Sequence, residues 1–101
     1  MSKWVKAASV DQIEEGSGSV IEAEGKSVAV FNIEGKFHAI DNMCPHRGGP
    51  LGEGSLDGNV VTCPWHGWLF DVTTGQCLVN PSVRNMTYNV KTEGQDVYLE
   101  I

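Results

Sequence analysis

Basic residues are scarce in this 101-residue chain: 7 Lys and Arg stand against 13 Asp and Glu, giving a formal net charge of −6 at pH 7. Binding to phosphates or to an anionic lipid surface requires a basic face, so this balance argues against nucleic acid and membrane as partners. Long apolar runs are also missing, since no stretch approaches the roughly eighteen residues of a membrane-spanning helix. We therefore expect a protein that binds neither nucleic acid nor membrane.

Cysteine is rare as well, with 3 in the chain, and the first four residues lack the apolar core of a secretion signal. Three cysteines cannot all pair, and an odd number without a signal argues against a disulfide framework. The expected location is therefore the cytoplasm.

The composition is that of one folded domain, with 41% hydrophobic and 20% charged residues. The 12 glycines and 4 prolines indicate many turns, which favours β structure over helix. A domain this small buries only about two-thirds of its chain surface, so a cofactor that cross-links it would add stability.

Alternating hydrophobic residues and Gly-containing turns predict β-strands at both ends of the chain. In the first part these strands cover residues 4–8, 20–24, 27–33 and 36–40, with one helical turn from Ser9 to Gln12. Near the C-terminus two alternating runs predict a single hairpin with one buried face: Met86, Tyr88 and Val90, then Val97, Leu99 and Ile101.

The middle of the chain is dense in Gly, Pro, Cys, His and Trp, with short strands expected at 60–62 and 68–72. We predict an all-β fold in which residues 1–41 and 83–101 form a base. Residues of about 42–82 would form an inserted, loop-rich binding lobe, and loops of this kind usually carry function.

Two short loops of this lobe contain Cys44-Pro45-His46 and Cys63-Pro64-Trp65-His66. Each proline removes a backbone donor and fixes φ, which stiffens its loop. Two such loops can converge on one metal centre. A structural zinc site is the alternative to an iron–sulfur cluster, although zinc modules usually use Cys-x₂₋₄-Cys and His-x₃₋₅-His pairs.

Cys-x-His, sixteen intervening residues and Cys-x-x-His resembles the Rieske motif, and Gly67-Trp68 strengthens the match. The chain is most similar to the Rieske domains of ring-hydroxylating oxygenases and to their ferredoxins. The resemblance implies a Rieske fold, an antiparallel β-sandwich or barrel-like base with a small cluster-binding subdomain. It also implies one Rieske-type [2Fe–2S] cluster.

By this resemblance, Cys44 and Cys63 would ligate one iron as thiolates, and His46 and His66 would ligate the other near the surface. Neutral imidazoles make the site less negative than four thiolates would. Rieske centres accordingly lie at about −150 to +300 mV, against about −400 mV for plant-type ferredoxins.

Departures from the respiratory Rieske proteins are informative. Gly49 and Trp65 stand where those proteins have a bracing disulfide, and Trp68 and Phe70 stand where they have hydroxyl groups that bond sulfur. Fewer hydrogen bonds to sulfur stabilise the reduced cluster less, so we expect a potential in the lower part of the Rieske range. Trp65 and Trp68, which flank His66, are interpreted as hydrophobic cover.

The other residues of chemical interest are not expected to be cluster ligands. Cys77 is expected to be a small buried thiol, and His38 an ordinary strand histidine. Arg47 would either dock on an acidic partner or hold its loop by a salt bridge. Asn80-Pro81-Ser82 resembles the proline-containing loop that covers the cluster in this family, with an ordinary turn as the alternative.

The leading hypothesis is a monomeric electron carrier, not itself an enzyme, that passes single electrons from a reductase to a terminal oxygenase. The alternative is a Rieske-like small subunit of a larger redox enzyme such as NADH-dependent nitrite reductase; many of these lack some ligands, whereas this chain keeps all four. A complete oxygenase would need two more histidines, and only His38 is left. An acidic carrier should associate with a basic partner more slowly as salt rises.

Overall fold

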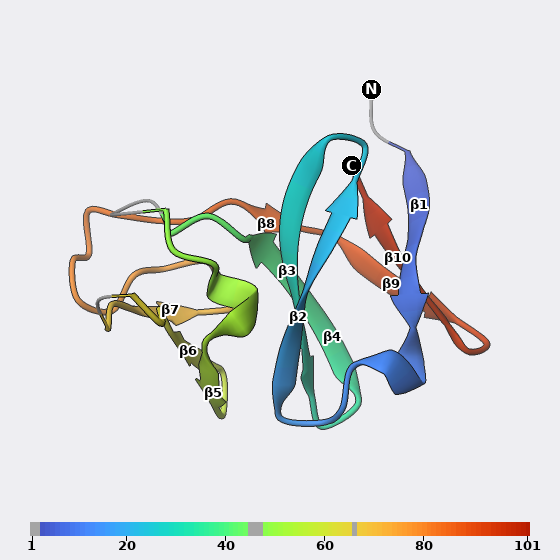
Figure 1. Ribbon diagram of the computed structural model, residues 1–101, viewed down its shortest axis with the longest axis horizontal. Helices are drawn as coiled ribbons and strands as arrows, with labels where there is room; N and C mark the ends of the chain where they lie inside the picture. Colours follow the sequence, from blue (N-terminus) through green and yellow to red (C-terminus); the bar gives the residue numbers. More distant parts are fainter. Residues whose placement is uncertain (1–2, 45–47, 66) are drawn as a thin grey trace.

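A computed structural model describes residues 3–44, 48–65 and 67–101 and contains three antiparallel sheets in this part of the chain (Figure 1). The strands are β1 (Trp4–Ser9), β2 (Ser17–Ala23), β3 (Lys26–Ile33), β4 (Lys36–Asp41), β5 (Ser55–Asp57), β6 (Val60–Thr62), β7 (Leu69–Asp71), β8 (Thr87–Tyr88), β9 (Val90–Glu93) and β10 (Asp96–Glu100). Two 3₁₀ turns, η1 (Val10–Gln12) and η2 (Leu51–Glu53), complete the described elements. The predicted all-β fold class is confirmed.

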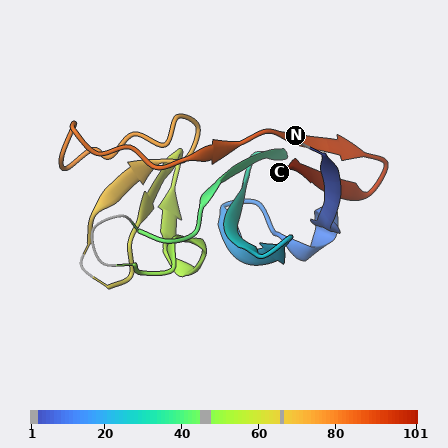
Figure 2. The same cartoon turned by 90° about the horizontal axis from the view of Figure 1, so that it is seen from above.

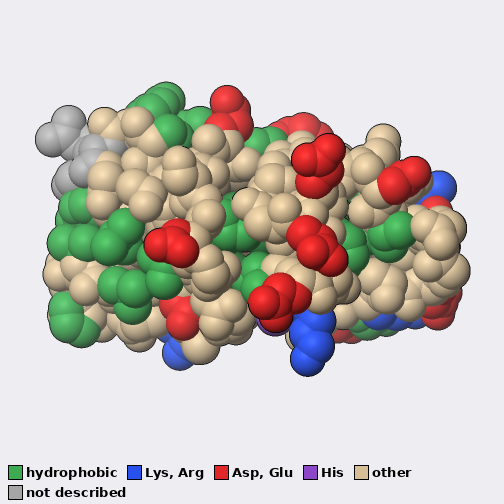
Figure 3. Space-filling model, turned by 90° about the horizontal axis from the view of Figure 1, so that it is seen from below, with side chains coloured by type: hydrophobic (Ala, Val, Ile, Leu, Met, Phe, Trp, Pro, Cys, Tyr) green, Lys and Arg blue, Asp and Glu red, His purple; other side chains and the backbone are tan. Residues whose placement is uncertain are grey.

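The three sheets follow one another along the molecule (Figures 1 and 2). Their strand orders are β1-β10-β9, β2-β3-β4-β8 and β5-β6-β7, and the last of these lies at the end farthest from the two termini. Figure 3 shows hydrophobic side chains gathered at that same end, whereas acidic side chains spread over the rest of the visible face. No helical segment in the described part of the chain has the length and apolar character needed to cross a bilayer.

Strand β3 is buried along its middle, from Val28 to Phe31, where each side chain is 0% exposed. Its alternate residues serve two cores. Val28 and Val30 pack with Leu99 on the side of the β1-β10-β9 sheet, and Ala29 and Phe31 pack on the other side with the residues that precede and follow the cysteine loops. The uninterrupted apolar run in the sequence is therefore the mark of a strand covered on both faces.

The strands predicted in the first part of the chain are confirmed, but β2 begins at Ser17, three residues earlier than expected. The extra residues include Gly18, whose backbone lies against the buried ring of Phe31. A Cβ at Gly18 would lie 2.5 Å from the Cδ1 and Cε1 atoms of Phe31. Glycine weakens the local strand signal, yet only glycine leaves room for that ring, so the early start of β2 depends on packing rather than on propensity.

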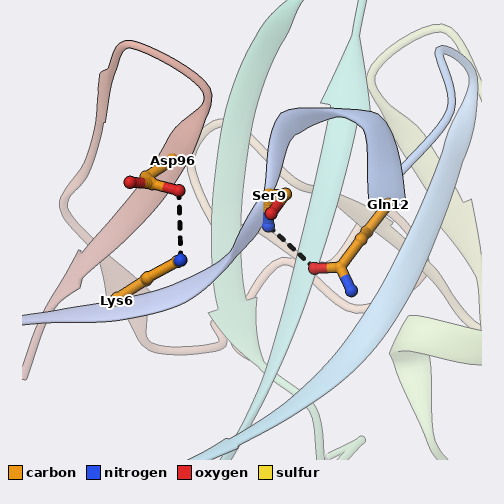
Figure 4. A network of polar contacts seen from close by, with 4 residues as sticks. All are labelled: Lys6, Ser9, Gln12 and Asp96. Atoms are coloured by element: carbon orange, nitrogen blue, oxygen red, sulfur yellow. Dashed lines mark hydrogen bonds and ion pairs between the residues drawn. The ribbon is translucent and has the colours of Figure 1, made fainter.

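The helical turn predicted after the first strand is present as η1, in 3₁₀ form. Gln12 Oε1 accepts a hydrogen bond from the Ser9 backbone N–H at 2.8 Å, which closes the turn (Figure 4). Nearby, Lys6 Nζ lies 3.2 Å from Asp96 Oδ1 and links β1 to β10. These contacts hold the chain where it leaves one sheet for the next.

The predicted C-terminal hairpin is wrong in two respects: residues 86–90 do not form one strand, and Met86, expected on the buried face, is 58% exposed. β8 pairs with β4, whereas β9 pairs with β10, and the chain passes from one sheet to the other at Asn89. There the Glu100 N–H donates to the Asn89 carbonyl at 3.0 Å, and Asn89 Nδ2 donates to Glu100 Oε1 at 2.8 Å. Period-two alternation continues through Asn89, so the sequence pattern contains no sign of the change of sheet.

Tyr88 provides a test of the packing of β8 at high pH. Burial, and secondarily the charge of Asp41, raise the pKa of Tyr88 above its ordinary value of 10.0. The folded chain therefore holds this proton more tightly than the unfolded chain, and the resulting stability is complete below about pH 10 and lost as pH rises through the raised pKa. Thermal unfolding between pH 9 and 12 should show this alkaline decline in the parent protein and a flatter profile in Tyr88→Phe. Equal slopes in both proteins would contradict it.

Candidate metal centre

The first predicted cysteine lies at the base of a tight hairpin, residues 42–51, called here the first cysteine hairpin. Met43 and Pro50 form a β-bridge, and the Cys44 N–H donates to the Gly49 carbonyl at 2.9 Å. The Gly48 N–H donates back to the Cys44 carbonyl at 2.6 Å. Gly48 has φ of +77°, a left-handed conformation that favours glycine, so this residue lets the chain turn back toward its own stem.

The second predicted cysteine has the same arrangement in the second cysteine hairpin, residues 62–69, whose stem is formed by β6 and β7. The Cys63 N–H donates to the Trp68 carbonyl at 2.8 Å, and the Gly67 N–H donates to the Cys63 carbonyl at 3.0 Å. Gly67 also has φ of +77°. Each cysteine thus bonds the residues four and five places ahead. The shared pattern Cys-Pro-x-x-Gly was the available sequence signal for these two glycines.

The two cysteine hairpins meet at Gly49. A Cβ built at Gly49 would lie 2.6 Å from the Cys63 sulfur and 3.3 Å from the Cβ of Trp65. Since the Gly49 carbonyl also bonds Cys44, this one residue links the first hairpin to the sulfur of the second. Cys44 and Cys63 are each 1% exposed and belong to the same apolar core. The structure therefore brings these two predicted ligands together.

The two predicted histidine ligands, His46 and His66, lie outside the described residues, as do Pro45 and Arg47. Within the described residues, no group of three or more His, Cys, Asp and Glu side chains is placed to share a metal ion. The described half of the predicted ligand set is a pair of buried soft donors, one from each of two matching hairpins. That donor chemistry fits an iron–sulfur core bridging the hairpins.

Asn42 anchors the first cysteine hairpin, a role that the sequence reasoning missed. It is 8% exposed, its carbonyl accepts from the Leu51 N–H at 2.8 Å, and its Oδ1 accepts from the Gly52 N–H at 2.8 Å. Its Nδ2 donates to Ser27 Oγ at 3.2 Å on β3. The sequence shows only an asparagine just after a predicted strand, and that position by itself does not identify a hydrogen-bond partner.

A third hairpin, residues 76–84, lies beside the other two and is closed by a bridge between Gln76 and Arg84. Cys77 is 1% exposed in the same core as Cys44 and Cys63, which confirms its expected burial. A turn leads into this hairpin: Gly75 has φ of +82°, and its N–H donates to the Asp71 carbonyl at 2.7 Å.

The three hairpins expose four apolar side chains, which we call the apolar end: Met43 (62% exposed), Trp65 (64%), Leu78 (51%) and Val79 (52%). Among the described residues of these three hairpins, Arg84 at the base of the third is the one charged side chain. Trp68 packs against the core, as expected of a hydrophobic cover. Trp65 differs from that expectation, because most of its surface faces solvent.

Comparison with known proteins agrees with this geometry. A family model described as the Rieske [2Fe-2S] domain matches residues 3–95. The ferredoxin component of a naphthalene 1,2-dioxygenase system from Pseudomonas aeruginosa is 39% identical to this chain, over 98% of the chain and 96% of its own length.

Solved structures share the fold. A chain in a complex of reduced oxygenase and oxidized ferredoxin in carbazole 1,9a-dioxygenase superposes with a TM-score of 0.87 at 31% identity, covering 95% of this chain and 91% of that one. A protein assigned as the small subunit of an NADH-dependent nitrite reductase from Mycobacterium tuberculosis reaches a TM-score of 0.92 at 23% identity, covering 100% and 96%. At that identity the second likeness concerns the fold alone.

Proposed function

Because the chain belongs to the Rieske [2Fe–2S] domain family, we propose that it is the ferredoxin component of a multicomponent dioxygenase system. It carries one electron at a time from a reductase to a terminal oxygenase and transforms no substrate itself. The observation that carries this proposal is the near full-length likeness to a dioxygenase ferredoxin, joined to two buried cysteines where two matching hairpins meet. A cytoplasmic monomer is the form that we propose.

In this proposal Cys44 and Cys63 hold one iron and His46 and His66 hold the other, and residues of about 42–82 act as the cluster-binding lobe. The cluster supplies reversible one-electron chemistry. The chain contributes the rest: hairpins stiffened by backbone hydrogen bonds fix both sulfurs, and the apolar core around Cys44 and Cys63 excludes water from them.

The nitrite reductase alternative is less well supported. Its representative shares 23% of its residues with this chain, whereas the naphthalene dioxygenase ferredoxin shares 39% over almost the same length. Both kinds of protein have the fold, so only the sequence likeness separates them, and it favours the dioxygenase ferredoxin.

Reconstitution tests the proposal. The purified protein should contain about two irons and two labile sulfides per chain, as a [2Fe–2S] centre requires. A reductase with its nicotinamide cofactor should reduce it, and an oxygenase component should reoxidise it. Zinc without labile sulfide would overturn the assignment of the cofactor. Turnover of a substrate by the isolated chain would overturn the assignment as a carrier.

We further propose that the apolar end is where the redox partners dock. It lies at the cysteine hairpins, and its four described side chains are apolar, so a partner that covers them desolvates no ionised group among them. Contact at this end also brings the partner's redox centre near the cysteine hairpins, which shortens the distance over which an electron must pass. The acidic residues over the remaining surface lie outside this contact and act at longer range, by steering a basic partner toward the carrier.

A charge placed in the apolar end should weaken docking. Val79→Asp is expected to raise the Kd for the oxygenase component about ten-fold or more, because an ionised carboxylate would be desolvated in the contact. Titration of the oxygenase with the ferredoxin, followed by the rate of electron transfer, measures the change. Thr92→Asp, an exposed substitution on β9, adds the same charge elsewhere and should bind as the parent does. Equal losses in both variants would assign the effect to net charge and contradict docking at this end.

A further inference from the structure

Gln76 has an unusual set of partners for a side chain at the surface. Its Nε2 lies within hydrogen-bond distance of three backbone carbonyls: Pro81 at 3.0 Å, Cys77 at 3.2 Å and Val83 at 3.2 Å. A primary amide has two N–H groups, so these three acceptors share them. The acceptors come from both sides of the third hairpin, and the amide therefore ties the two sides together from within.

The backbone of Gln76 is fixed at the same time. Its carbonyl accepts from the Asp71 N–H at 2.9 Å at the end of β7, and its own N–H donates to Thr74 Oγ1 at 3.2 Å. β7 directly follows Trp68, whose carbonyl bonds Cys63. Gln76 thus connects the third hairpin to the strand that supports the second cysteine hairpin.

Other hydrogen bonds act with the Gln76 amide in the third hairpin: the Cys77 N–H donates to the Val83 carbonyl at 3.1 Å, the Val83 N–H to the Asn80 carbonyl at 3.0 Å, and the Ser82 N–H to Asn80 Oδ1 at 3.1 Å. Pro81 has no N–H to donate, Leu78 donates to the Leu69 carbonyl at 2.8 Å, and the Asn80 N–H donates to the Cys77 sulfur at 3.4 Å. Cys77 lies in the same core as the two predicted cysteine ligands. Any outward movement of this hairpin would therefore open that core to water.

We propose that Gln76 is a positioning residue that holds the third hairpin closed over the cysteine core and so limits water at the redox centre. This inference rests on the proposed function, because it assumes a cluster at Cys44 and Cys63. Two thiolates around a 2+ oxidised core make the centre about neutral, and reduction makes it negative. Water stabilises the negative form more, so loosening the hairpin raises the reduction potential.

Gln76→Met tests the proposal, because methionine keeps the length of the side chain and its neutrality but has no N–H. In the cluster-loaded protein, amide hydrogen exchange at Asn80 and Val83 should become about five-fold faster, the effect of losing one net hydrogen bond. The reduction potential should rise. Gln95→Met, at an exposed glutamine between β9 and β10, makes the same chemical change far from the site and should alter neither quantity.

Gln76→Glu is the second variant, nearly the same shape without a donor, and it should accelerate exchange at the same amides even if Gln76→Met folds poorly. Unchanged exchange and an unchanged potential in these variants would overturn the role of Gln76. Faster exchange with an unchanged potential in Gln76→Met would also overturn it, because it would make Gln76 structural only. Iron and sulfide content of the parent protein reports separately on the proposed function, so the two can fail independently.

Discussion

Replacing Cys63 by serine is expected to abolish normal assembly of the cluster and to destabilise the β5-β6-β7 end of the molecule. A serine hydroxyl is not deprotonated near neutral pH and is a poor ligand for an iron–sulfur core. Metal binding contributes folding free energy in sites whose ligands come together only on folding. The Cys63 sulfur lies against Gly49, so its removal affects both cysteine hairpins.

Cys77→Ser is the matched control for this substitution. Cys77 is as buried as Cys63, at 1% exposure, and belongs to the same core, but it is not among the proposed ligands. Its hydroxyl can still accept the Asn80 N–H. We expect Cys77→Ser to keep full iron and sulfide content and the visible spectrum of the parent, with a modest fall in melting temperature. Retention of a normal cluster in Cys63→Ser, or its loss in both variants, would contradict the assignment of Cys63 as a ligand.

Local sequence patterns were sufficient to predict those strands in which the strand residues and the flanking turn residues indicate the same boundaries. β3, β4 and β6 lie within a residue or so of their predicted positions, because an apolar run or alternation ends at a turn. The cysteine hairpins were found for another reason: four ligand-type residues at a particular spacing form a pattern that few other sites need. The register of those hairpins is equally local, since the same Cys-Pro-x-x-Gly pattern closes each of them.

Features that depend on distant residues were missed. The change of sheet at Asn89 depends on its bonds to Glu100, and the early start of β2 depends on the ring of Phe31. Asn42 and Gln76 read as ordinary polar residues until the carbonyls and amides that surround them are known. Side-chain anchors of this kind leave no periodic signal, so the sequence predicts candidate ligands but not the groups that hold the loops in place.

Gly49 is a residue for which the sequence and the structure give different reasons for interest. From the sequence it is notable only as the place where respiratory Rieske proteins have a disulfide cysteine. The structure adds a positive requirement, because the site for a Cβ is already occupied by the Cys63 sulfur, at 2.6 Å, and by the side chain of Trp65. Gly49 is not among the residues with positive φ, so space and not backbone conformation is what demands glycine here.

Gly49→Ala is therefore expected to displace the Cys63 sulfur or the Trp65 side chain and to distort the cluster site. Overpacking of this kind costs about 1–3 kcal/mol, so the melting temperature should fall, and iron content per chain should fall with it. The cluster that remains should have a shifted EPR spectrum, since a moved thiolate changes the ligand field of its iron.

Gly35→Ala is the control variant. Gly35 lies in the β3–β4 turn at φ of +88° with open space around it, so its replacement should lower stability through backbone strain alone. Its cluster should keep the parent spectrum and full iron content. A parent-like spectrum and iron content in Gly49→Ala would mean that the first cysteine hairpin can move away from Cys63 without cost, and that contact at Gly49 is not what aligns the two sulfurs.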